Sequence, residues 1–119
     1  MTLPEYIGSS LTKPFKWGEH DCMHFAAGWA ERETGREILA PFKPWENARQ
    51  ALRIIHQVGG LAAFFDAHYE RINPNLARDG DLTVIRDSAA LFSGAQIVSV
   101  GETGLVFIDR TEAICAWRF

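Results

Sequence analysis

The chain has 119 residues, of which 47% are hydrophobic and 23% are charged, and its formal net charge is -3. This size and composition predict a single globular domain, residues 1–119, that buries a core without covalent staples. The basic residues are scattered among a similar number of acidic ones, so no basic surface is evident and we expect no nucleic-acid partner. No segment approaches the roughly 20 apolar residues of a membrane span.

The first ten residues, MTLPEYIGSS, have neither a basic start nor an apolar run, so we expect no signal peptide and synthesis in the cytoplasm. Two cysteines form at most one disulfide, and such low cysteine usage is typical of a reducing compartment. Export by a machine that reads no signal peptide is compatible with this expectation.

The first half of the chain has helical periodicity. Asp21 is a suitable N-cap for a helix that Gly35 ends in a left-handed conformation. Its apolar positions recur every three or four residues: Cys22, Phe25, Ala26, Trp29 and Ala30.

A second helix is expected from Pro44, in its first turn, to Gly59 and Gly60, which stop it. Its predicted apolar stripe is Ala48, Ala51, Leu52, Ile55 and Val58. The segment LAAFFDAHYE, residues 61–70, predicts a third, shorter helix.

The second half changes to strand periodicity. Strands are predicted within residues 82–86, 96–100, 104–109 and 113–119, which are rich in β-branched and aromatic residues. The segment ARDGDL predicts a turn into the first of these strands, and GETG predicts a hairpin turn. Helices followed by strands indicate an α+β fold, with N-terminal helices packed on a small C-terminal antiparallel sheet or half-barrel. Cys115 is expected in the core rather than in a disulfide with Cys22.

Cys22 lies at the start of the first predicted helix, which makes its thiol the candidate nucleophile. A helix N-terminus favours the thiolate, and its free N–H groups suit an oxyanion, as cysteine hydrolases require. The alternative is that Cys22 is a small core residue, because it continues the apolar stripe of Phe25 and Trp29. Periodicity alone favours this alternative.

The segment FKWGEHDC, followed by a helix and much later by GDL, resembles the NlpC-type peptidases, which are papain-like cell-wall cysteine hydrolases of bacteria and phages. Over nearly the whole chain the sequence is similar to a compact offshoot of that superfamily from phage and prophage tail-gene clusters. The NlpC pattern is matched by Phe15, Trp17, Gly18, Asp21, Cys22, Gly80, Asp81 and Leu82. The offshoot is matched by residues 17–22, which include His20, and by Gly59, Gly60, Gly80, Asp81, 104–107 and 116–118. The resemblance implies that Cys22 is the nucleophile, with the N–H groups of residues 22 and 23 near the oxyanion.

The resemblance also implies a histidine base on a strand soon after Gly-Asp-Leu, yet that stretch contains none. Ala89 and Ala90 stand near the expected position. His20 is the first substitute, although a histidine there also suits hydrogen bonding to the loop backbone. Of the others, His24 and His56 are expected at the surface and His68 on an apolar face.

Two hypotheses follow. The first is a phage or prophage tail-associated cysteine hydrolase that cuts peptidoglycan stem-peptide amides with Cys22 and His20. The second is a non-catalytic tail-assembly or binding module that keeps the fold and a vestigial cleft. The implied partners are therefore peptidoglycan peptide or phage tail proteins, and the implied location is the virion or tail.

The expected cleft residues are Trp17, Gly18, Asp21 and Asp81. Trp17 and Trp45 are expected to be the exposed tryptophans. Cysteine and histidine spacing predicts no metal site, and no cofactor motif is present.

Overall fold

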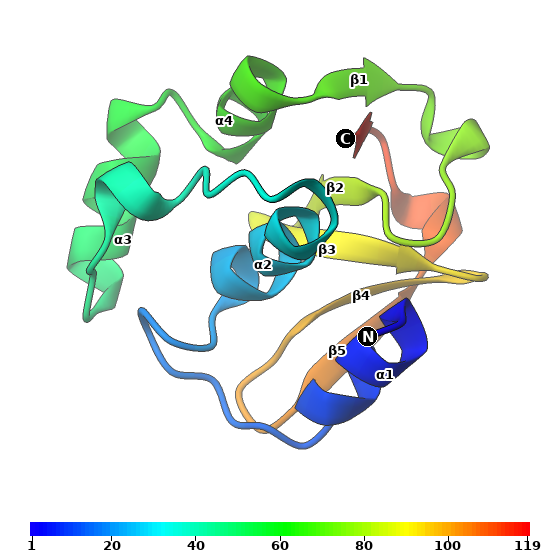
Figure 1. The fold of residues 1–119 in the computed structure, drawn as a ribbon, viewed down its shortest axis with the longest axis horizontal. Helices are drawn as coiled ribbons and strands as arrows, with labels where there is room; N and C mark the ends of the chain where they lie inside the picture. Colours follow the sequence, from blue (N-terminus) through cyan, green and yellow to red (C-terminus); the bar gives the residue numbers. More distant parts are fainter.

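The computed structural model describes residues 1–119 as an α+β fold with four α-helices and one open, six-stranded antiparallel sheet (Figure 1). The helices are α1 (Leu3–Ser10), α2 (Cys22–Thr34), α3 (Ala48–Gln57) and α4 (Leu61–His68). The strands are β1 (Glu70–Ile72), β2 (Leu82–Ile85), β3 (Ser88–Ser93), β4 (Gln96–Val100), β5 (Leu105–Asp109) and β6 (Ala116–Arg118). The predicted α+β class is confirmed.

α2 is the central helix, and it packs against β3 and β4 (Figure 1). The Asp21 carboxylate accepts a hydrogen bond from the backbone N–H of His24, and Gly35 ends the helix with φ of 74°. Phe25 and Ala30 are almost completely buried, as the apolar periodicity predicts. The predicted boundaries and inner face of this helix are confirmed.

The strands follow the order β1-β6-β2-β3-β4-β5 in the sheet. The predicted GETG turn is confirmed, because it joins β4 to β5 and the N–H of Gly101 donates to the carbonyl of Gly104. β1 and β3 were not predicted. Arg86 and Asp87 both have positive φ, which forms the two-residue hairpin turn between β2 and β3 without any glycine.

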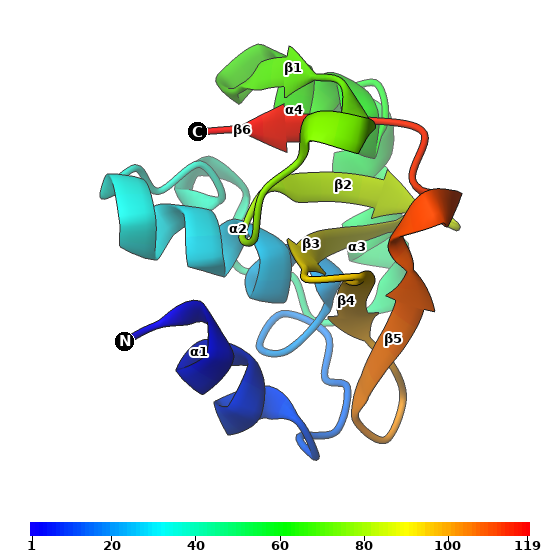
Figure 2. The same cartoon turned by 90° about the vertical axis from the view of Figure 1, so that its right-hand side faces the viewer.

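The two faces of the sheet carry cores of different size. Side chains alternate along each strand, so Leu91 and Val98 point into a cluster of 21 buried residues shared with the helices. Phe92 and Ile97 point the other way, into a cluster of six buried residues. Figure 2 shows α1 and α2 together on one side of the sheet.

Two helical predictions need correction. The second helix begins at Ala48, with Asn47 as its N-cap, so Pro44 lies in the preceding loop instead of the first turn. Leu52, predicted on the buried stripe, is 62% exposed. α1 was not predicted, although Thr2 and Glu5 have the Thr-x-x-Glu spacing of a capping box and form one in the structure.

The third predicted helix is confirmed as α4. None of the four helices has the length and apolarity needed to cross a membrane.

Candidate functional site

Cys22 is the first residue of α2 and lines a cavity of about 50 Å³. Twelve residues line this cavity and eleven of them are hydrophobic. Trp17, predicted as a cleft wall, is one of them and is 38% exposed. The cavity is therefore an apolar space beside a half-buried thiol, and the partly exposed Trp17 forms part of its wall.

α3 and the start of α4 form the wall of the cavity opposite α2. Ala51, Ile54, Ile55 and Val58 of α3 line it together with Leu61 of α4. Of the four α3 residues only Ala51 is fully buried. The helix thus places aliphatic side chains over the cavity while leaving the space below them unfilled.

The polar member of the lining is Asp21, and its carboxylate is fully engaged. Oδ1 accepts hydrogen bonds of 2.9 Å from the backbone N–H and from Nδ1 of His24. Oδ2 accepts one of 3.0 Å from the Gly18 N–H and one of 2.7 Å from Nε1 of Trp45. Burial alone raises the pKa of Asp21, but the hydrogen bonds from His24 and Gly18 outweigh it and hold that pKa below its usual value.

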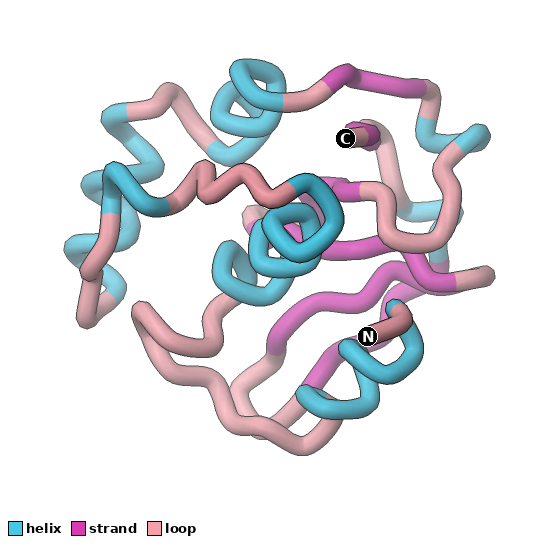
Figure 3. The backbone as a smooth tube through the Cα atoms, in the orientation of Figure 1, coloured by secondary structure: helices cyan, strands magenta, loops and turns pink.

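The loops carrying these partners are brought together at Gly18. Figure 3 shows loop segments leading into both α2 and α3. Gly18 has φ of +78°, and a Cβ atom at this position would lie 1.8 Å from the carbonyl oxygen of Trp45. Only glycine allows both the left-handed conformation and this close backbone approach.

The surroundings of Cys22 disfavour its thiolate by raising the pKa of the thiol. Burial raises its pKa, and the negative charge of Asp21 acts in the same direction. The backbone N–H groups of Ala89, Met23 and Cys22 itself oppose this rise, without reversing it.

His20 does not line the cavity. Its backbone carbonyl accepts a hydrogen bond from Lys16, and its ring packs edge-on against Phe25 with a centroid distance of 6.3 Å. The residue is only 5% exposed and its Nε2 has no hydrogen-bond partner. Burial, and then the charge of Lys13, lowers the pKa of His20. This predicted base is therefore absent from the cavity lining that includes Cys22.

The prediction for His24 is wrong, because its ring is half-buried between two partners. It contacts Asp21 and packs on Trp45 with a ring-centroid distance of 4.6 Å. A carboxylate only accepts hydrogen bonds, so Nδ1 of His24 carries the proton in this pair. This pair resembles the carboxylate–imidazole half of a catalytic triad, but His24 does not line the cavity that holds Cys22.

The remaining histidines lie away from the cavity. His56 is exposed, as predicted. His68 is half-buried and packs edge-on against Phe64 with a centroid distance of 4.9 Å, which agrees with its predicted apolar face.

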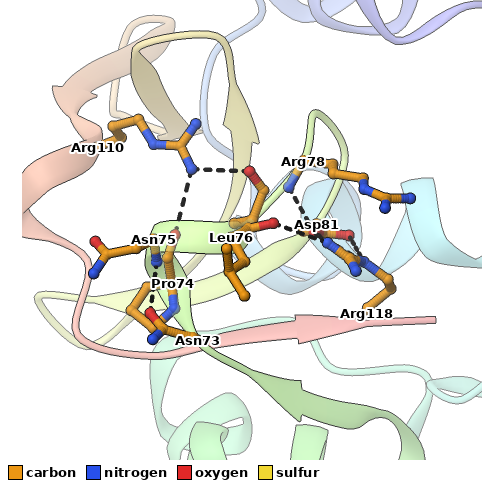
Figure 4. A network of polar contacts seen from close by, with 9 residues as sticks. Asn73, Pro74, Asn75, Leu76, Arg78, Asp81, Arg110 and Arg118 are labelled. Atoms are coloured by element: carbon orange, nitrogen blue, oxygen red, sulfur yellow. Dashed lines mark hydrogen bonds and ion pairs between the residues drawn. The ribbon is translucent and has the colours of Figure 1, made fainter.

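Asp81 lies outside the cavity lining, in a polar network around the turn into β2 (Figure 4). Its Oδ2 accepts hydrogen bonds of 2.7 Å from the Arg78 N–H and 2.9 Å from Nη2 of Arg118. Arg118 also donates to the carbonyl of Leu76. Arg110 donates to Ala77 and Pro74, so two guanidinium groups hold the segment 74–77 against the sheet.

Sequence reasoning missed the role of Trp45. It was expected at the surface, yet it is 5% exposed, donates to Asp21 and lines the cavity. No local pattern identifies this residue, because its contact with Asp21 spans 24 positions of the chain. Cys115 is half-buried, its thiol lies 3.7 Å from the carbonyl of Val84, and both cysteines are free.

No group of three or more His, Cys, Asp or Glu side chains is arranged to hold a metal ion. What the site offers chemically is an apolar space and one thiol whose pKa is raised by burial.

No curated protein matches the chain. No solved structure matches it either. A family model described as a domain of unknown function, DUF6950, matches residues 1–119, and the chain therefore belongs to that family.

Proposed function

We propose that this protein is a papain-like, NlpC-type domain of phage or prophage tails that binds a peptide segment at the Cys22 cavity without cutting it. The observation that carries the proposal is the cavity lining, in which no imidazole accompanies the Cys22 thiol. A cysteine hydrolase needs a base at this place, because a positioned acid–base group contributes roughly 100-fold to 10,000-fold to the rate.

The protonation state of the thiol supports a binding role. A nucleophilic cysteine reacts as its thiolate, and catalytic sites lower the thiol pKa with a cationic neighbour. Here burial and Asp21 raise the pKa of Cys22. The Asp21 carboxylate that could have oriented a base is occupied by His24, Gly18 and Trp45.

One observation favours the second candidate, a cysteine hydrolase of peptidoglycan stem-peptide amides. The N–H groups of Cys22, Met23 and Ala89 lie near the sulfur. Amide groups placed there suit an oxyanion that forms during acyl transfer. On this reading a ligand or partner supplies the missing base, or water accepts the proton slowly.

The test measures the pH dependence of Cys22 alkylation in a Cys115→Ser background. We expect the pKa from this titration to lie above the free-thiol value of about 8.5. Purified peptidoglycan is then incubated with the wild type and with Cys22→Ser. Equal and negligible product from both agrees with the binding role, whereas Cys22-dependent release of peptides would establish the hydrolase instead.

A further inference from the structure

We infer that the Cys22 cavity accepts one short, uncharged aliphatic side chain of a bound peptide, of the size of alanine or valine. This inference deepens the proposed binding role and depends on it. It assigns a specificity to the cavity that lies between α2, α3 and the loop at Trp17.

The lining determines the chemical class of the occupant. Eleven of the twelve lining residues are hydrophobic. The carboxylate of Asp21 already accepts four hydrogen bonds, so it has no capacity left for a cationic or hydrogen-bonding ligand group. A charged group in this space would lose its hydration without gaining a partner, and such burial is strongly unfavourable.

The volume determines the size of the occupant. A cavity of roughly 150 Å³ accepts a whole benzene molecule, whereas this one measures about 50 Å³. The space suits a group of one to three carbons, so the rest of the ligand must lie outside. A side chain that projects from a peptide backbone has this shape.

The side chains of α3 do not fill the space between this helix and the core. Ile54, Ile55 and Val58 line it but are only partly buried. Each methylene that fills such a site improves binding by about 0.8 kcal/mol, which is about fourfold in affinity. A valine side chain should therefore bind more tightly than alanine, and alanine more tightly than glycine.

The experiment uses the full chain with Cys115→Ser, so that Cys22 is the single thiol. Alkyl methanethiosulfonates transfer their alkylthio group to the thiolate, which forms a disulfide and releases methanesulfinate. Propyl, sulfonatoethyl and trimethylammonioethyl reagents are compared, and Cys115 in a Cys22→Ser variant is the reference thiol. We expect the propyl-to-charged rate ratio at Cys22 to exceed the ratio at Cys115 at least tenfold. Equal ratios at the two thiols would overturn the apolar assignment.

Blocked tripeptides test the peptide source. N-acetyl-Gly-X-Gly-amide, with X as glycine, alanine, valine or aspartate, is added at millimolar concentration before the propyl reagent. We expect valine to slow labelling at least twofold more than glycine, with no protection by aspartate. Protection by propanol but by none of the peptides would place a free small molecule in the cavity and overturn the peptide assignment.

A filled cavity provides the control within the chain. Ala51→Val adds volume to the lining, whereas Leu52→Val changes the adjacent, exposed residue of α3. Ala51→Val should abolish the difference between valine and glycine peptides, and Leu52→Val should preserve it. If Ala51→Val does not fold, the reagent and peptide comparisons on the parent chain still decide the matter. Peptidoglycan cleavage is a separate readout, so failure of the non-hydrolytic role is distinguishable from failure of this specificity.

Discussion

The indole Nε1 of Trp45 donates a hydrogen bond of 2.7 Å to Oδ2 of Asp21, which joins the loop before α3 to the N-cap of α2. The same carboxylate accepts the N–H of Gly18, so the loop before α2 and the loop before α3 meet at one buried anion. Because the carboxylate also caps α2, the helix start that carries Cys22 depends on a contact with Trp45, 24 positions along the chain.

Trp45→Phe should reveal the strength of this connection. The substitution keeps an aromatic ring but removes the donor to a buried carboxylate. We expect the free energy of unfolding in urea to fall by about 1.5–3 kcal/mol, the usual value for a hydrogen bond to a charged group. Trp17→Phe is the matched control, since Trp17 is half-exposed and is not bonded to Asp21. Equal losses for the two variants would contradict a specific role for the Trp45 indole.

Gly18→Ala should lower the free energy of unfolding by more than the positive φ of Gly18 alone would explain. Gly94 also has positive φ, of 58°, but a Cβ there meets nothing within 4 Å. Gly94→Ala should therefore cost about 1 kcal/mol, as expected for backbone strain alone. At Gly18 the Cβ would overlap the Trp45 carbonyl oxygen, and we expect a further loss of about 1–3 kcal/mol, the typical cost of overpacking. Urea titrations of the two variants measure the difference, and similar losses would argue against the close approach.

The pH dependence of stability should report the buried imidazole of His20. Burial lowers its pKa in the folded state, while the unfolded chain has a value of about 6.5. Below that pH the unfolded state binds more protons at His20 than the folded state does. The free energy of unfolding therefore falls as the pH drops below about 6.5, and this loss is absent above that pH.

His20→Phe should therefore reduce the difference in unfolding free energy between pH 7.5 and pH 5. Some dependence should remain, because burial also lowers the pKa of His68. His56→Gln is the control, since His56 is exposed. If His20→Phe retained the full pH difference of the wild type, the buried imidazole would not be its origin.

The features that sequence reasoning predicted well are local. Asp21 and Gly35 delimit α2 because capping depends on residues within one helical turn, and the GETG turn is likewise self-contained. β3 escaped prediction because Ser88, Ala89 and Ala90 have little strand preference and gain their stability from pairing and burial.

The candidate site depends on tertiary contacts, so less of it could be predicted. Trp45 reaches Asp21 only through the folding of the loop before α3. Leu52 has the spacing of a buried residue, but it is 62% exposed. The α3 residues that line the cavity are Ala51, Ile54, Ile55 and Val58. The expectation that Ala89 and Ala90 stand near the missing base comes from the family resemblance and stays a prediction.

Ala89→His should place an imidazole next to the Cys22 thiol. Ala89 belongs to the helix-facing cluster of the sheet, whereas the adjacent Ala90 belongs to the opposite cluster. A protonated imidazole beside the sulfur favours the thiolate, so we expect the pKa of Cys22, measured by alkylation against pH, to fall by at least one unit. Both residues are completely buried, so each histidine should cost about 1–3 kcal/mol of stability through overpacking. Ala90→His is therefore the matched control: it carries the same added bulk without the approach to Cys22. A common thiol pKa in the two variants would show that β3 does not present position 89 to the nucleophile position, and would remove the main structural support for an enzyme-derived cleft.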